Sequence, residues 1–303
     1  MSKFISITIL LATLRIATPL ILGALGGVFS EKSGVVNIAL EGIMLMGAFA
    51  SVVATYYTKN PWIGVIFAML VGAVFAAIHA VVSIKYKANQ VVSGTAINML
   101  AGGVTIFMLR LLFNVEGTSP SVAKLPQWYI PGTEYSFNPI VYFALILVVV
   151  SWVVLYKTPL GLRIRTVGEH PAAADTVGIN VYRVRYLAVI ISGVLAGLAG
   201  AHLAIGEGTV FVRNMTAGRG FIALAAMIIG NWHPIGALGA ALLFGYSEAV
   251  QITLSGITIA GAKVPSQFIE MIPYVVTIIV LAGFIGKTVP PKASGVAYEK
   301  GER

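Results

Sequence analysis

The chain has 303 residues, of which 58% are hydrophobic and only 10% charged, whereas soluble domains carry about 45–50% apolar and about 25% charged residues. A water-soluble fold cannot hide so much apolar surface, so the composition excludes a soluble protein and predicts an integral membrane protein in contact with lipid. The formal net charge is +9, but the basic residues lie mostly in short gaps between apolar segments, which argues against a nucleic-acid partner.

Apolar segments long enough to cross a bilayer recur along the chain. A spanning helix needs about 20 mainly apolar residues. Windows of this kind occur at 5–28, 35–57, 61–84, 91–113, 138–156, 185–205 and 268–286. The first window continues past Arg15 and has no convincing cleavage site, so we interpret it as a retained helix rather than a signal peptide.

One further apolar block, 218–254, is interrupted by the polar sequence Asn231-Trp232-His233-Pro234. Proline removes a backbone donor and the polar residues favour a turn, so we expect two helices here, the first short enough to enter the membrane only partway. The sequence therefore predicts an all-α, polytopic membrane bundle of about nine spans, with eight or ten also compatible, that forms one domain over 1–303.

The basic residues indicate the orientation, because Lys and Arg in short loops stay on the cytoplasmic side. We place the long loop 157–184 in the cytoplasm. The inside segments then carry Lys32, Lys85, Lys87, Lys157, Arg163, Arg165, Arg183, Arg185, Lys287, Lys292, Lys300 and Arg303, whereas the outside segments carry only Lys3, Lys59, Lys124, Arg213 and Lys263. For nine spans, the C-terminus lies inside and the N-terminus outside.

The loop 157–184 contains the signals of a helix of its own. Glu169-His170-Pro171 is typical of a helix start, the alanines that follow favour helix, and Gly178 suits a helix end. We expect a short cytoplasmic helix at 169–179. The other long loop, 114–137, is rich in proline and glycine and predicts an outside loop with an interfacial aromatic anchor.

No motif for covalent chemistry is present. The four histidines show no metal-ligand spacing, there is no cysteine, and neither HExxH nor GxSxG occurs. Gly286-Lys287-Thr288 is similar to the end of a phosphate-binding loop, but Leu281 stands where the first glycine must be. We therefore expect no cofactor, no metal and no ATPase site in the chain. His79 and His202 are expected to pair within the bundle.

Ionisable groups at membrane depth are costly, and their default interpretation is functional. Glu41 and Glu248 are candidates for lining a polar pathway, while Arg219 and Glu270 have structural alternatives, such as pairing with a carboxylate or facing interfacial water. Neutral amides suit the recognition of an uncharged polar solute, although they also join helices. The candidate pathway residues are Asn37, Glu41, Asn98, Arg219, Glu248 and Gln251.

Three stretches, in chain order, resemble motifs of permeases that import branched-chain amino acids, ribose and nucleosides. They are SGVVNIALEGIMLMGA at 33–48, TPLGLRIRTVGE with AAADTVGI between 158 and 179, and AGRGFIALAAMIIGNW followed by PIGA between 217 and 237. The resemblance implies the permease fold of an ATP-binding cassette (ABC) importer, in which the middle motif engages the ATPase. The coupling residues it implies are Gly168, Glu169, His170, Ala172, Ala173, Asp175 and Gly178.

The form EKSGVVNIALEG at 31–42 is most similar to the bacterial nucleoside-importer branch of this family. This resemblance implies nucleoside import across the cytoplasmic membrane, with a lipoprotein receptor, a second and different permease, and a separate ABC ATPase as partners. Import of a sugar or a branched-chain amino acid by the same mechanism stays open. An ion-coupled secondary transporter that uses Glu41 and Glu248 also stays open.

Overall fold

The computed structural model describes residues 7–129, 135–255 and 288–300, and between the last two ranges residues 258–259, 262–263, 267, 269, 271, 275–276, 278–279 and 282–283. The described α-helices are α1 (Ile7–Lys32), α2 (Leu40–Thr58), α3 (Pro61–Ala80), α4 (Gln90–Phe113), α5 (Pro139–Lys157), α6 (Pro159–Glu169), α7 (Pro171–Thr176), α8 (Val181–Ala201), α9 (Arg219–Ile229) and α10 (Pro234–Leu254). Two π-helical turns, η1 (Val81–Lys85) and η2 (His202–Glu207), extend α3 and α8.

Two short hairpins complete the described secondary structure. Strand β1 (Trp128–Tyr129) pairs antiparallel with β2 (Ser136–Phe137), so that Trp128 lies opposite Phe137. Strand β3 (Thr258–Ile259) pairs antiparallel with β4 (Ala262–Lys263). Trp128 and Tyr129 are both exposed, as the predicted interfacial anchor requires.

Seven described helices are long and apolar enough to cross a membrane: α1, α2, α3 with η1, α4, α5, α8 with η2, and α10. The predicted total of about nine spans is not confirmed. The short apolar helix α9, at 11 residues, is too short to count as a full span. The expected span at 268–286 falls mostly outside the described residues, and Glu270 lies outside them entirely.

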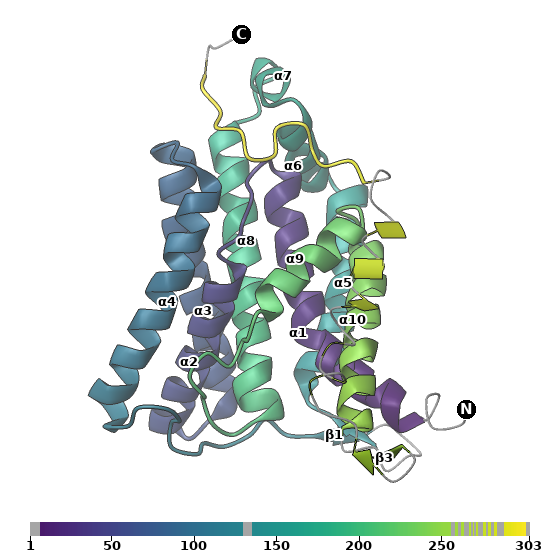
Figure 1. Ribbon diagram of the computed structural model, residues 1–303. Helices are drawn as coiled ribbons and strands as arrows, with labels where there is room; N and C mark the ends of the chain where they lie inside the picture. Colours follow the sequence, from purple (N-terminus) through teal and green to yellow (C-terminus); the bar gives the residue numbers. More distant parts are fainter. Residues whose placement is uncertain are drawn as a thin grey trace.

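The helices run side by side along one bundle, and the start of α1 and residues 288–300 lie at opposite ends of it (Figure 1). We call the end that carries α6, α7 and residues 288–300 the α7 end. The opposite end, where residues 114–129 connect α4 to α5, is the loop end (Figure 1). The expected placement of the two termini, outside for the N-terminus and inside for the C-terminus, stays a prediction.

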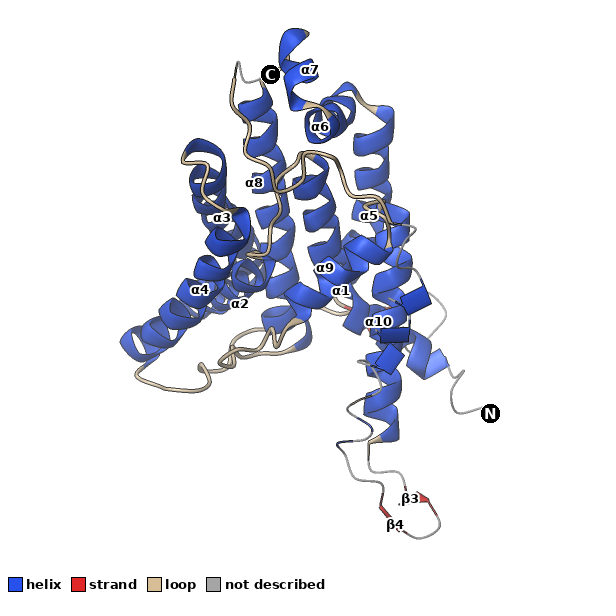
Figure 2. Ribbon diagram, turned by 45° about the horizontal axis from the view of Figure 1, so that its top comes forward, coloured by secondary structure: helices blue, strands red, loops and turns tan. Residues whose placement is uncertain are grey.

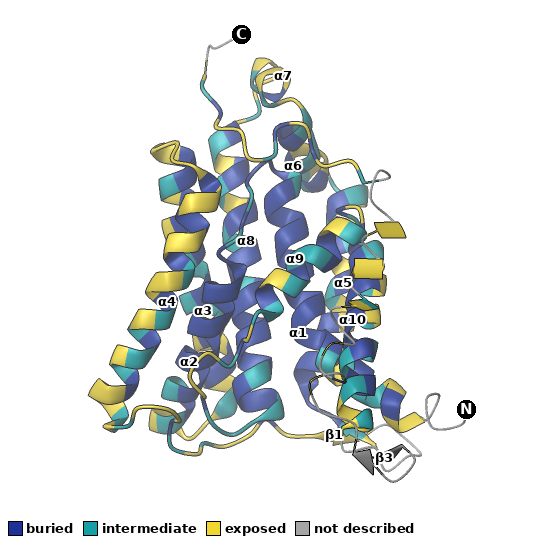
Figure 3. Ribbon diagram, in the orientation of Figure 1, coloured by how far each residue is buried: buried dark blue, intermediate teal, exposed yellow. Residues whose placement is uncertain are grey.

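Burial separates the central helices from the lipid-facing ones. Figure 3 shows α2, α8 and the second half of α1 mostly buried, whereas α4 carries an exposed face along its length. The exposed side chains of α4 include Met99, Phe107 and Leu111. Because lipid is as apolar as these side chains, this exposure fits a membrane-embedded face.

Small residues allow the central helices to touch. A Cβ added to Gly72 of α3 would lie 2.2 Å from the carbonyl oxygen of Gly193 in α8, and one added to Gly200 would lie 2.1 Å from that of Met44 in α2. A Cβ at Gly47 would lie 2.6 Å from the Cα of Gly197. Backbones can approach this closely only where side chains are absent, so the glycines fix the packing of α2, α3 and α8.

Several helices begin with the same short signal, a capping residue followed by proline. Asn60, Asn138 and Thr158 accept hydrogen bonds from backbone amides of the first turns of α3, α5 and α6. Proline at the first helical position has no amide that needs a partner. The pair Thr158-Pro159 is the signal for α6. This helix was not predicted from the sequence.

Two predicted elements need correction. The window 35–57 was expected to be helical throughout, but α2 begins only at Leu40, because Gly34 has a φ of +91° and the following residues leave the helical path. The loop 157–184 was expected to hold one helix at 169–179. It holds two, α6 and α7, and α7 covers only Pro171–Thr176 because His170 is not helical and Gly178 has a φ of +83°.

The predicted interruption of the block 218–254 is confirmed. Asn231 and Trp232 both have positive φ values, 54° and 52°, so the chain reverses between α9 and α10. Pro234 is the first residue of α10. The turn thus lies at the polar residues from which it was predicted.

Candidate substrate pathway and coupling region

Residues 33–39, between α1 and α2, form an irregular segment that we call the break, and side chains of neighbouring helices pair its backbone groups. Gln90 of α4 accepts a hydrogen bond from the amide of Val36 (2.6 Å), and His79 of α3 donates to the carbonyl oxygen of Val36 (3.0 Å). Ser30 of α1 donates to the carbonyl oxygen of Val35 (2.6 Å). Irregular backbone is tolerated inside a membrane protein only when protein groups satisfy it in this way.

Two candidate pathway amides belong to this same arrangement. Asn98 of α4 accepts from the amide of Gly42 (2.7 Å) and donates to the carbonyl oxygen of Ile38 (3.0 Å). Asn37 is fully buried and donates to the hydroxyl of Ser192 in α8 (2.9 Å). Both amides therefore join helices, and Asn98 satisfies backbone groups at the start of α2, where intrahelical partners are missing.

Glu41, in the first turn of α2, holds the N-terminus of α9. Its two carboxylate oxygens accept hydrogen bonds from the amides of Gly218 (2.8 Å) and Gly220 (2.6 Å). A Cβ on Gly220 would lie 2.5 Å from the Cα of Glu41, so only glycine permits this approach. The first amides of a helix lack intrahelical partners and attract negative charge, which explains how a carboxylate is accommodated here.

Arg219 and Glu248 form an ion pair between α9 and α10, with 2.6 Å between Nη2 and Oε1. Their side chains are 25% and 22% exposed, so the pair is partly accessible rather than sealed in the core. Gln251 lies three residues after Glu248 on α10, hence on the same helix face, and is also partly exposed. The structure thus brings Glu41, Arg219 and Glu248 together around the start of α9.

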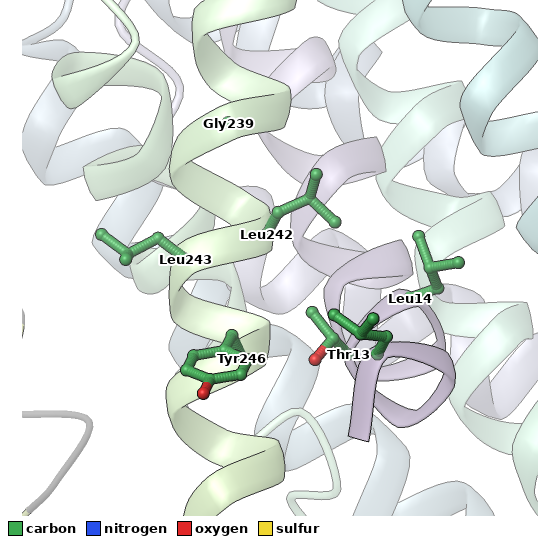
Figure 4. A pocket seen from close by; sticks show the side chains of 7 residues that line it. Thr13, Leu14, Gly239, Leu242, Leu243 and Tyr246 are labelled. Carbon is green, nitrogen blue, oxygen red and sulfur yellow. The ribbon is translucent and has the colours of Figure 1, made fainter. Parts of the chain in front are cut away.

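Figure 4 shows a separate hollow between α1 and α10, with a volume of about 500 Å³. Its lining is apolar except for Thr13 and Tyr246, and the hydroxyl of Thr13 donates to the backbone of Ile9 (2.7 Å). The remaining lining residues are Leu10, Leu14, Gly239, Leu242 and Leu243. Such a surface suits lipid or another apolar segment, and it offers a polar solute little to bind.

The other candidate residues lie on α6, α7 and their junctions at the α7 end. Ala172 and Ala173 of α7 are exposed, while the next residue, Ala174, is buried against the protein. His170 and Gly178, which flank this helix, are exposed as well. α7 lies beyond the end of the bundle (Figure 1), and its exposed residues Ala172 and Ala173 have small side chains.

Gly168, Glu169 and Asp175 are placed differently. Gly168 is buried, and a Cβ there would lie 2.1 Å from the carbonyl oxygen of Lys32 at the end of α1. Glu169 is half-buried at the end of α6, and Asp175 pairs with Lys300 at 3.9 Å. These positions attach the loop to the bundle rather than present it to a partner.

His79 and His202 lie inside the bundle, as predicted. Besides its bond to the break, His79 accepts a hydrogen bond from Ser93 at Nδ1 (3.0 Å). His202 donates from Nε2 to the carbonyl oxygen of Arg15 (3.0 Å). No group of three or more metal-ligating side chains occurs in the described part of the chain.

The fold is a polytopic bundle of membrane-spanning helices, in which side chains pair the irregular segment before α2 and the first turn of the short helix α9. Residues 9–281 match the family model described as branched-chain amino acid transport system / permease component. The chain belongs to this family.

Named relatives place the chain among ABC transporter permeases. It is 47% identical to the guanosine ABC transporter permease protein NupQ of Bacillus subtilis, covering 96% of each chain. It is 43% identical to the nucleoside ABC transporter permease protein NupC of Lactococcus lactis, covering 94% of each chain. The guanosine ABC transporter permease protein NupP, also of B. subtilis, is 26% identical over 90% of this chain and 80% of its own. The chain is a permease subunit of an ABC transporter.

Proposed function

We infer that this permease subunit imports nucleosides across the bacterial cytoplasmic membrane, driven by ATP hydrolysis in a separate subunit. The observation that carries the proposal is the similarity, over nearly the whole of each chain, to permeases named for guanosine and nucleoside transport. The motif at 31–42, whose residues form the end of α1, the break and the start of α2, supports the same substrate class.

The charges around α9 are compatible with an uncharged substrate. The carboxylate of Glu41 accepts hydrogen bonds from two backbone amides, and Arg219 forms an ion pair with Glu248. A solute that passes this region meets paired charges and hydrogen-bonding groups, such as Gln251, rather than an isolated charge. Nucleosides are neutral and rich in donors and acceptors, so they fit such a lining. We assign the pathway to the face where α9 and α10 carry these residues.

Three protein partners follow from the proposal. The exposed small residues of α7 dock into an ATPase subunit, because side chains as short as Ala172 and Ala173 allow close approach. A second permease of different sequence completes the pathway, and the two guanosine permeases named in one bacterium, NupQ and NupP, support this pairing. A substrate-binding lipoprotein delivers the nucleoside at the loop end.

Transport then proceeds by alternating access. Closure of the ATPase subunits displaces α7, and α6 carries this displacement to the bundle as a rigid lever. The ATPase and the loaded receptor must each bind one state of the permease more tightly than the other, since otherwise neither would bias the equilibrium.

The test is reconstitution of the complete transporter in proteoliposomes, with loaded receptor, labelled guanosine and no ion gradient. We expect uptake that requires ATP hydrolysis, persists with ionophores present, and is competed by other nucleosides but not by ribose or leucine. An ATPase variant without its nucleotide-binding lysine is the control. Uptake that follows an ion gradient without ATP, or competition by sugar or amino acid alone, would contradict the proposal.

A further inference from the structure

Residues 288–300 form an extended segment that crosses the α7 end of the bundle, and we call it the C-terminal strap. In Figure 2 the molecule is turned so that this end comes forward, and the strap passes beside α8 and below α6 and α7. Within the strap, Ala293 and Tyr298 are only 7% and 8% exposed. The strap is thus packed against the protein at these positions, although its sequence predicted no role beyond its basic charge.

Backbone hydrogen bonds attach the strap to two places that the transport cycle must move. The amide of Ala293 donates to the carbonyl oxygen of Gly168 at the end of α6 (2.9 Å). The amide of Gly295 donates to the carbonyl oxygen of Gly34 in the break before α2 (3.2 Å). Near its beginning, the amide of Val289 donates to the side chain of Asn231, in the turn between α9 and α10 (3.1 Å).

Arg185, near the start of α8, clamps the strap onto the break. Its guanidinium donates from Nε to the carbonyl oxygen of Ser33 (3.1 Å) and from Nη1 to that of Val296 (3.0 Å). The residue is 2% exposed, and its Nη2 has no hydrogen-bond acceptor within the described ranges. Burying a guanidinium that is held only by carbonyl oxygens costs free energy. The need to fill space between the helices therefore does not explain an arginine at this position.

The end of the strap is fixed by side chains. Glu299 pairs with Lys87 in the turn between α3 and α4, and Lys300 lies 3.9 Å from Asp175 of α7. The hydroxyl of Tyr182 donates to the carbonyl oxygen of Tyr298 (3.3 Å). The strap therefore connects α7 itself to the bundle, as well as the end of α6.

These contacts form a continuous series from the coupling region to the membrane interior. α6 and α7 contact the strap, the strap and Arg185 hold the break, and the break leads into the first turn of α2. That turn carries Glu41, whose carboxylate holds the first amides of α9. Displacement of α7 thus has a physical route to α9, the short helix beside the proposed pathway.

We propose that the C-terminal strap, clamped by Arg185, transmits movement of α6 and α7 to the start of α2, with Arg185 acting as a positioning residue. The proposal rests on the ATP-driven import proposed above. It assigns a coupling function to residues to which the proposed function gives no role. Without the strap, α6 would act on the break only through the packing of Gly168 against Lys32 and Gly34. Less of the movement would then reach α2 and α9, and more ATP would be hydrolysed for each nucleoside transported.

The test measures guanosine uptake per ATP hydrolysed by the complete reconstituted transporter. Arg185→Met removes the clamp, and Arg183→Met, an exposed arginine two residues earlier, is its matched control. Ala293→Pro removes the amide that donates to Gly168, whereas Ala293→Ser keeps that amide and nearly the same size. We expect Arg185→Met and Ala293→Pro to lower uptake per ATP by about two- to thirtyfold, while Arg183→Met and Ala293→Ser match the wild type.

An unchanged ratio for Arg185→Met and Ala293→Pro would overturn the proposal, and so would a proportional loss of uptake and hydrolysis, which would show a structural role only. If Arg185→Met does not assemble, Ala293→Pro against Ala293→Ser decides the question. A wild-type complex that shows no ATP-dependent nucleoside uptake would refute the proposed function. A working wild type with unchanged ratios in the variants would refute only the role of the strap.

Discussion

Glu41 illustrates how a charged residue is held at membrane depth in this protein. Its carboxylate binds the amides of Gly218 and Gly220, which belong to a segment 177 and 179 positions further along the chain. The partner is backbone rather than a basic side chain, and the interaction joins α2 to the half-helix α9. A functional interpretation of Glu41 therefore concerns the position of α9 as much as contact with a solute.

Asn98 provides the sharpest residue-scale prediction. Both halves of its amide are bonded to the backbone around the start of α2, so Asn98→Leu leaves a donor and an acceptor unpaired. We expect a destabilisation of about 1–3 kcal/mol, seen as a lower melting temperature of the purified complex, with little change in transport rate per folded molecule. Met99→Leu, at an exposed neighbouring position, is the control.

The opposite result would assign Asn98 to the pathway. If uptake per molecule falls while the melting temperature and basal ATP hydrolysis stay at wild-type values, the amide contacts substrate and its bonds to α2 are dispensable.

At the scale of elements, α7 is a six-residue helix that cannot be stable through its own hydrogen bonds. It is held by Ala174, which is buried, and by the junctions on either side, including the contact of Gly168 with the end of α1. Its remaining alanines face outward. A helix fixed to the bundle on one side and exposed on the other is suited to transmit force from a docked partner.

Ala173→Trp tests this element. The exposed alanine leaves room for tryptophan in the isolated permease, but the larger side chain should overfill an ATPase cleft and weaken binding by about 1–3 kcal/mol. We expect normal expression, reduced copurification of the ATPase and reduced uptake. Ala123→Trp, the same change at an exposed position of the loop end, should leave ATPase binding intact. Normal binding and uptake by Ala173→Trp would show that α7 is not the docking helix.

For the whole molecule, the distribution of basic residues agrees with the arrangement of the helices. By the bounds of the elements, the α7 end carries Lys32, Lys87, Lys157, Arg163, Arg165 and Lys292, whereas the loop end carries Lys59, Lys124 and Arg213. Positive charge marks the cytoplasmic side, so we expect the α7 end to face the cytoplasm.

Single cysteines test this orientation, because the natural chain has none. His170→Cys and Lys124→Cys change exposed residues at the α7 end and the loop end respectively. In intact cells, a membrane-impermeant maleimide should label position 124 at once and position 170 only after permeabilisation. The unaltered chain gives the background. Labelling of both positions from outside would overturn the topology.

Local sequence properties determined most of the helical segments. The windows 61–84, 91–113 and 138–156 agree with α3, α4 and α5 within a few residues, because hydrophobic length and flanking turn residues act on each segment separately. The polar interruption at 231–234 likewise marked the turn before α10. Charge in short loops depends on neither packing nor partners, so it predicted the side of each connection.

Tertiary structure decided what depends on which segments meet. The start of α2 at Leu40, rather than within the apolar window, requires the side chains of Gln90, His79 and Asn98 as substitutes for helical hydrogen bonds. The pairing of Glu41 with α9, and the burial of Arg185 beneath the C-terminal strap, join residues more than 100 positions apart. No local pattern encodes such contacts, since their energies exist only once the helices have packed and the backbone groups of the break need partners.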